Sequence, residues 1–218
     1  MTAAGCGHSG SSLRSGSSRV VGGVLTGSVI AVHNTWSCST PVDLDLVRVQ
    51  LDDTTRDAVH IGPGCTGTIR RLEILGDGAG LGPGGDGVKV HAGARDLRVL
   101  SGVINCGRAG PRKHQDAIQA MGGTSVVFND VTSTGCANSF MFINTGKGRR
   151  GTPTGIRCVN CRAVSHNYSI FVGSSESSGA TNGVFTSRVP PHVTPNAVSP
   201  LVAGNHWKSS GLPRRRRR

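Results

Sequence analysis

A short run of alternating apolar and polar residues recurs along the chain and predicts its architecture. The three clearest copies each open on an aspartate, over residues 57–62, 86–91 and 116–121, and their starts are 29 and 30 residues apart. Alternation with a period of two is typical of a β-strand, and recurrence at this distance indicates a repeat architecture. The helical spacing of apolar residues at i, i+3 and i+4 is absent, so the sequence predicts an all-β fold.

Weaker copies of the same run extend the pattern in both directions, over residues 28–33, 139–144 and 168–173. Between the copies, two or three short strands per repeat predict a coiled ribbon of parallel strands, a solenoid of about six coils. We therefore expect three regions: a flexible Gly/Ser-rich leader, a β-helix domain and a C-terminal tail, over residues 1–19, 20–188 and 189–218.

The C-terminal tail is expected to leave the sheet, because proline cannot donate a hydrogen bond to a strand ladder. It contains five prolines: Pro190, Pro191, Pro195, Pro200 and Pro213. The tail is expected either to be disordered or to cap the last coil. At the other end, the leader lacks the apolar segment of a signal peptide, and no run of about 18 apolar residues is present that could span a membrane.

Composition and charge narrow the choice of partners. The 33 glycines and an aromatic content of 4% fit short strands joined by tight turns. Five of the net +12 charges lie in residues 214–218, which leaves +7 on the rest of the chain. A basic run can bind nucleic acid, but no aromatic residues alternate with these arginines, so nucleic acid is not expected. The remaining positive charge is compatible with an acidic polymer as the partner.

The seven cysteines form no zinc array, and no metal site is predicted from them. Cys158 and Cys161 lie three positions apart in an expected strand, where such side chains point to opposite faces. We therefore expect neither a local disulfide nor a shared metal there. Two other pairs lie about one repeat apart, and adjacent coils separated by about 4.8 Å would bring them within disulfide reach. Whether these two pairs are oxidised stays open: Cys38 with Cys65, and Cys106 with Cys136.

The aspartate-led strands, including the segment 114–119 (HQDAIQ), and the run 151–155 (GTPTG) resemble those of bacterial right-handed parallel β-helix repeat proteins. These belong to the pectate-lyase-like superfamily, and the resemblance covers residues 20–188. It implies a right-handed parallel β-helix with polysaccharide lying along the sheet of repeat strands, and we expect a secreted, monomeric protein. The superfamily also contains hydrolases, epimerases, adhesins and inert members, so the resemblance does not fix an activity.

Strand alternation predicts which side chains of the repeat strands face outward. The inward positions are uniformly apolar, whereas the outward positions form two rows. The first row contains Ala31, His60, Lys89, Gln119, Phe142 and Phe171, and the second contains His33, Gly62, His91, Met121, Asn144 and Gly173. Cations and amides in such rows can bind successive units of an acidic polysaccharide, and exposed aromatic rings can stack on sugars. A plain solvated sheet surface is the alternative.

The candidate catalytic residues are Lys89, His91, His114 and Asp116. A uronate lyase neutralises the substrate carboxylate so that a base can remove the adjacent proton, and either histidine or the lysine is a candidate base. The candidate substrate-binding residues are His60, Arg112, Lys113, Gln119, Phe142, Asn144 and Phe171.

The aspartates that open the repeat strands, Asp57, Asp86 and Asp116, have a simpler interpretation as acceptors of backbone hydrogen bonds in turns. Asp116 is the expected exception, because His114 lies close to it. The calcium cluster and arginine of pectate lyases and the doubled aspartate of polygalacturonases are not visible, so the sequence does not establish that the chain is an enzyme. It specifies no cofactor, and calcium stays open. A non-catalytic glycan-binding or structural β-helix is the alternative function.

Overall fold

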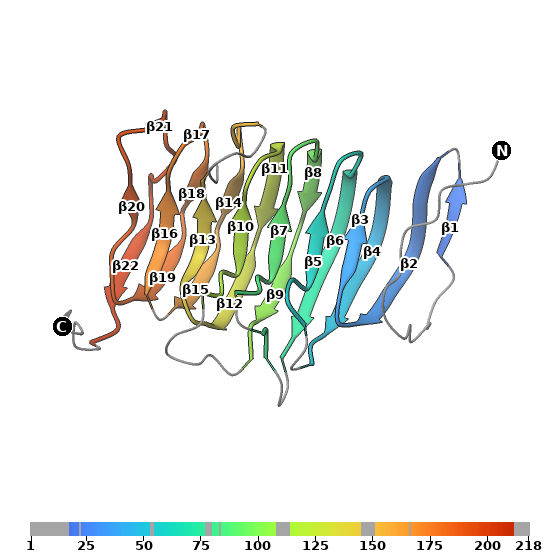
Figure 1. The fold of residues 1–218 in the computed structure, drawn as a ribbon, viewed down its shortest axis with the longest axis horizontal. Coiled ribbons are helices and arrows are strands. Elements are labelled where there is room, and N and C mark those ends of the chain that lie inside the picture. The colour runs from blue at the N-terminus through green and yellow to red at the C-terminus, as the bar shows by residue number, and fades with distance from the viewer. Residues whose placement is uncertain are drawn as a thin grey trace.

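The computed structural model describes residues 18–21, 23–52, 55–76, 80–82, 84–107, 114–144, 151–165 and 167–211. Within these ranges the chain forms β-strands and no helix, which confirms the all-β prediction, and none of the described segments is a helix able to cross a membrane. Nearly all the strands lie in two sheets, of thirteen and seven strands. Figure 1 shows the smaller sheet in front of the larger one, with successive repeats side by side along the long axis of the molecule.

The seven-stranded sheet contains five of the six predicted repeat strands, those that start near residues 57, 86, 116, 139 and 168. Neighbouring strands in this sheet are all parallel. Residues at equivalent positions of successive repeats pair, as Val88 does with both Val59 and Ile118. In spatial order the strands are β20 (His192–Val193), β16 (Tyr168–Val172), β13 (Ser139–Ile143), β10 (Ile118–Ala120), β7 (Val88–Val90), β5 (Val59–Ile61) and β3 (Trp36–Cys38).

The thirteen-stranded sheet is parallel except where β1 pairs antiparallel with β2. Its first parallel strands are ten residues long, and later repeats divide the same path into two shorter strands, so that β6 pairs with both β8 and β9. The strands are β1 (Ser18–Val21), β2 (Val24–His33), β4 (Pro41–Gln50), β6 (Thr66–Leu75), β8 (Arg95–Val99), β9 (Gly102–Asn105), β11 (Thr124–Asn129), β12 (Val131–Cys136), β14 (Arg157–Val159), β15 (Arg162–Ser165), β18 (Gly179–Thr181), β19 (Val184–Ser187) and β22 (His206–Ser209). A separate pair joins β17 (Ser175–Glu176) to β21 (Ala197–Val198).

The first repeat strand differs from the prediction. Residues 28–33 lie in β2 of the larger sheet, whereas Trp36–Cys38 pairs with β5 and places Ser37 opposite His60. Both segments alternate, and alternation identifies a strand without saying which sheet it joins. Ala31 and His33 therefore do not belong to the outward rows.

Strand pairing also continues past Val189, where the sequence predicts that it stops. The strands β20, β21 and β22 pair in parallel with β16, β17 and β19. The first four prolines of the tail lie between these strands, so they remove no donor from a ladder. The described residues therefore make seven passes through the smaller sheet; residues 1–17 and 212–218, which include most of the leader and the arginine run, lie outside them.

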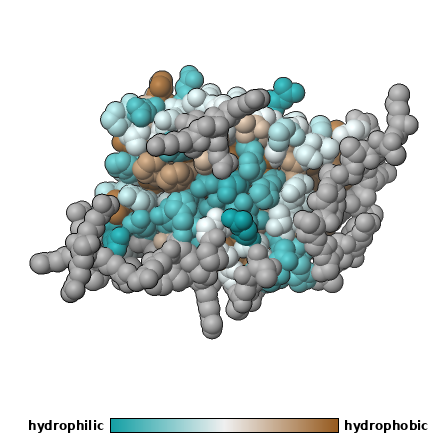
Figure 2. Space-filling view, viewed as in Figure 1, coloured by the Kyte–Doolittle hydropathy of each residue, from teal (hydrophilic) through white to brown (hydrophobic). Residues whose placement is uncertain are grey.

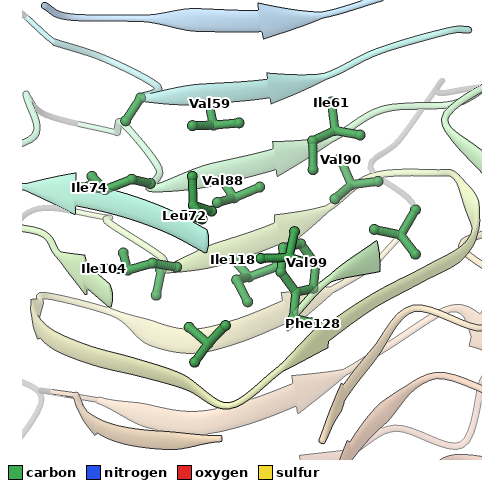
Figure 3. Packing of buried hydrophobic residues seen from close by; sticks show 14 of the residues in the cluster. Val59, Ile61, Leu72, Ile74, Val88, Val90, Val99, Ile104, Ile118 and Phe128 are labelled. Atoms are coloured by element: carbon green, nitrogen blue, oxygen red, sulfur yellow. The ribbon is translucent and has the colours of Figure 1, made fainter. Parts of the chain in front are cut away.

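The core lies between the two sheets. The inward side chains of the smaller sheet are fully buried, as Val88, Ile118 and Ile170 illustrate. They pack against Leu72, Ile74, Val99, Ile104 and Phe128 of the larger sheet (Figure 3). Parallel stacking in register repeats this contact in each pass, which explains why the inward columns are uniformly apolar.

Three disulfides link residues within the described part of the chain. Cys38–Cys65 and Cys106–Cys136 join neighbouring repeats, with Cα atoms 5.3 and 5.0 Å apart, which settles the two pairs that the sequence left open. The expectation for the third pair is wrong, because Cys158 and Cys161 are also joined. The strand β14 ends at Val159, and Asn160 takes a left-handed conformation with φ of 55°, which turns both cysteines into the core.

Candidate functional site

The outward face of the seven-stranded sheet carries one continuous row of side chains. Strand register aligns Ser37, His60, Lys89, Gln119, Phe142, Phe171 and His192 along the axis. In Figure 2 the middle of this face is hydrophilic and passes into a hydrophobic patch toward the C-terminal repeats. The row thus has a polar half over β5, β7 and β10 and an aromatic half over β13, β16 and β20.

Lys89 lies at the centre of the polar half, between two carboxylates. Its Nζ is 2.9 Å from Asp86 Oδ2 and 3.1 Å from Asp57 Oδ1, and 14% of its side chain is exposed. Partial burial works to lower the Lys89 pKa, but the charges and hydrogen bonds of Asp86 and Asp57 outweigh it and raise the pKa. The amine therefore keeps its proton at neutral pH, which disfavours its predicted role as a base and favours a role as a cation.

The three aspartates form a ladder across the repeats. Asp57 Oδ1 accepts the backbone N–H of Asp86 at 2.9 Å, and Asp86 Oδ1 accepts that of Asp116 at 3.1 Å. Asp116 Oδ1 accepts the N–H of Ser139 at 2.9 Å, and this serine takes the place of aspartate in the next repeat. The backbone-acceptor interpretation is therefore correct, and it holds also for Asp116, which was expected to be the exception. The donor, however, lies in the following repeat rather than in the local turn.

Burial changes the acidity of two of these aspartates. Asp86 is 1% exposed and Asp116 is fully buried. Desolvation, followed by the charge of Asp116, raises the pKa of Asp86 to about 6 against the opposing effect of Lys89. Desolvation likewise raises the pKa of Asp116. Neither carboxylate reaches the surface, so Asp116 acts on its neighbours rather than directly on a ligand.

His114 lies above Asp116 at the edge of the aromatic half. Its Nδ1 is 3.6 Å from Asp116 Oδ2, and its Nε2 is 3.2 Å from the amide nitrogen of Asn138. Because an amide nitrogen can only donate, His114 Nε2 accepts, and in the neutral ring the proton is then on Nδ1. The same amide donates to Asp116 Oδ1 at 2.8 Å, and its oxygen accepts from Asn167 at 3.2 Å.

Asn138 was missed by sequence reasoning. A signal was available, because Asn138 and Asn167 occupy the same repeat position, directly before the paired residues Ser139 and Tyr168. Amides repeated at one turn position can form a ladder of side-chain hydrogen bonds, and these two do so.

His60 and His91 form a hydrogen-bonded pair near Lys89. His60 is the partner of Lys89 in strand register, and His91 follows Lys89 by two residues. His60 Nδ1 is 2.9 Å from His91 Nε2, and the rings are nearly parallel, with an interplanar angle of 16°. The other nitrogen of His60, Nε2, is 3.6 Å from Asp57 Oδ2. The three side chains therefore form a line of carboxylate, imidazole and imidazole on the half-exposed surface, and one proton links the two rings.

The aromatic half is stacked along the axis rather than laid flat on the sheet. Phe142 and Phe171 lie face to face at 4.6 Å with an interplanar angle of 10°, and His192 stacks on the other side of Phe171 at 5.3 Å. Tyr168 meets Phe171 edge-on at 6.0 Å. The phenyl rings therefore cover one another's faces and present mainly their edges, which limits sugar stacking to edge contacts.

The remaining predicted residues are placed as follows. Gln119 points outward but is only 9% exposed, and it donates to Asp116 Oδ2 at 3.4 Å. Asn144 is half-buried, and its side-chain oxygen accepts the N–H of Ser174 at 3.1 Å. Arg112 and Lys113 lie outside the described residues.

Asp86, His114 and Asp116 place possible metal-ligand atoms within 4.8 Å of one another. Calcium takes about six to eight oxygen ligands. Here Asp86 uses one oxygen for Lys89 and the other for the amide of Asp116, and Asp116 Oδ1 is bound by Ser139 and Asn138. The cluster therefore does not fit a calcium ion.

Comparison of the chain with family models, with curated proteins and with solved structures found no match. On the outward face of the seven-stranded sheet, Lys89, His60, His91 and His114 lie over the buried carboxylates of Asp86 and Asp116.

Proposed function

We propose that the chain is a right-handed parallel β-helix protein that acts on an acidic polysaccharide by lyase-like proton transfer along its seven-stranded sheet. The β-helix is supported by two parallel sheets in which each strand pairs with its counterpart in the next repeat. The three disulfides support an oxidising, extracellular location.

The observation that carries the activity is the His60–His91 pair backed by Asp57. An imidazole pair can take up a proton, and a carboxylate aligned with it orients the ring and stabilises the resulting positive charge. Lys89 is paired in register with His60, so a uronate carboxylate held at the cation would present its adjacent C–H to the histidines. This side-by-side arrangement of cation and base is what elimination from a uronate requires.

In the proposed reaction the histidine pair removes the proton from the carbon next to the uronate carboxylate. The electron pair of that C–H bond forms a carbon–carbon double bond, and the bond to the glycosidic oxygen breaks. The leaving oxygen takes a proton from water, and the histidine pair returns its proton to solvent. No redox partner is needed, and the products are two shorter chains, one with an unsaturated end.

A non-catalytic glycan-binding protein is the second candidate, and one observation favours it. The charge of Lys89 is already balanced by Asp57 and Asp86, and both buried carboxylates have their hydrogen-bonding capacity largely occupied. A face whose charges and hydrogen bonds are already paired within the protein can bind a polysaccharide through its exposed imidazoles and ring edges without transferring a proton.

The test compares His91→Ala with a control, His206→Ala, on the exposed strand β22 of the other sheet. Polygalacturonate and alginate are incubated with each protein, the double bond is followed by ultraviolet absorbance, and binding is measured by calorimetry. We expect the parent to cleave at least one polymer, His91→Ala to lose about 100-fold or more in rate, and the control to match the parent. Binding without cleavage by the parent supports the second candidate, and an absence of both overturns the proposal.

A further inference from the structure

A polar hollow lies on the thirteen-stranded sheet, away from the histidine face. Its volume is about 520 Å³, and it is lined by Asp130, Thr132, Asn160, Arg162, Asn182 and Val184. Strand register places Thr132, Arg162 and Val184 side by side in three successive repeats. Each repeat thus contributes one residue from a turn and one from the strand that follows it.

The turn residues share an unusual backbone conformation. Asp130, Asn160 and Asn182 have φ values of 48°, 55° and 54°, in the left-handed region that aspartate and asparagine tolerate better than most residues. Their backbone N–H groups bond to carbonyls of the following repeat, as Asp130 does to Val159 at 3.0 Å. The turn therefore explains the choice of residue type and leaves the three side chains exposed in a row.

The charged groups of the hollow are not paired with each other. Within the described residues, neither Arg162 nor Asp130 takes part in an ion pair or a side-chain hydrogen bond. Three arginines elsewhere on the same sheet do pair: Arg48 with Glu73, Arg70 with Asp43 and Arg71 with Glu73, all between 2.6 and 2.8 Å. Among the described residues Arg95, Arg98 and Arg157 are unpaired like Arg162, but none of them lines the hollow. The hollow thus keeps a guanidinium and a carboxylate apart and open to solvent.

The two amides add to this pattern, since Asn160 and Asn182 make no side-chain hydrogen bond to any other described residue. Adjacent repeats are about 4.8 Å apart, so equivalent polar groups recur along the axis at that spacing. Val184, 49% exposed, adds an apolar surface at one end. A ligand matched to these groups has a carboxylate, several hydroxyls and an apolar ring face.

We propose that this hollow is a second carbohydrate site, which binds a uronate-containing oligosaccharide. Arg162 receives the carboxylate, for which its planar guanidinium is suited. Asp130 and the two asparagines hydrogen-bond to ring hydroxyls, and Val184 contacts the apolar face of a sugar ring. The choice of a uronate rests on the proposed function, whereas the site itself belongs to the other sheet and transfers no proton.

The experiment is a titration of the ¹⁵N-labelled full chain with a trimer of galacturonate, followed by two-dimensional NMR. We expect shifts of backbone amides at 130–132, 160–162 and 182–184. Arg162→Gln should weaken binding at these amides about tenfold or more. The matched control is Arg157→Gln, an exposed arginine on β14 of the same sheet that does not line the hollow, and it should change binding less than about twofold. The methyl-esterified trimer should bind the parent as weakly as the acid binds Arg162→Gln.

The position of the shifts separates this inference from the proposed function. Shifts confined to residues around His60 and His91 overturn the second site and leave the proposed function standing. Shifts confined to the hollow support the second site and count against the histidine face. Equal losses in Arg162→Gln and Arg157→Gln indicate unspecific charge attraction and overturn the inference, as does an absence of shifts with the trimer.

Discussion

Ile118→Ala is expected to lower the free energy of unfolding by about 2–5 kcal/mol. Ile118 is fully buried in β10, with Val88 and Met141 at the equivalent positions of the repeats on either side. Figure 3 shows it among side chains of both sheets. Stacked repeats on both sides prevent the backbone from closing the cavity, so the cost includes lost burial and residual empty volume. Denaturant titration of the parent and the variant measures the difference.

The control for this prediction is Val164→Ala on β15, whose side chain is 53% exposed and should cost within about 0.5 kcal/mol. Gln119→Ala is expected to fall between them, at about 1 kcal/mol, because this outward residue is largely covered and bonds to Asp116. The sequence alone predicts a neutral change for Gln119. Equal losses in the isoleucine and valine variants would mean that the inward and outward positions are wrongly assigned.

Lys89→Met is expected to destabilise the protein by about 3–5 kcal/mol at pH 8, because it leaves Asp57 and Asp86 close together without their shared cation. The matched control is Arg70→Met, which removes ion pairs with Asp43 and Asp45 in which all the side chains are about half exposed. Exposed ion pairs contribute little to stability because solvent screens them, so the control should be nearly neutral. Chemical denaturation at fixed pH compares the two variants.

The loss of stability caused by Lys89→Met should increase as the pH rises. The pKa of Asp86 in the folded protein, about 6, lies above its ordinary value of 3.8, so the folded state binds this proton more tightly than the unfolded state. Stability from this group is therefore present at low pH and is lost as pH rises through about 6. Without Lys89 the pKa rises further, so the variant should lose more stability between pH 5 and 8 than the parent. Parallel pH profiles would contradict the assigned role of Asp86.

The sequence by itself determined five of the six predicted repeat strands and which of their side chains face the core. Alternation fixes which residues share a face of a strand, and a near-constant spacing aligns these faces between repeats. Val59, Val88 and Ile118 could therefore be recognised as one buried column, with His60, Lys89 and Gln119 as the row on the other side. Spacing of one repeat also indicated the Cys38–Cys65 and Cys106–Cys136 pairs as candidates for disulfides.

Only the tertiary structure decided which neighbours those outward residues have. The contact between His60 and His91, the position of Lys89 between two carboxylates and the depth of Asp86 depend on side-chain directions and distances that no spacing fixes. The same holds for Cys158 and Cys161, because a single left-handed residue reverses the alternation between them. Periodicity determines the face on which a residue lies, whereas burial, pairing and acidity arise from contacts across repeats.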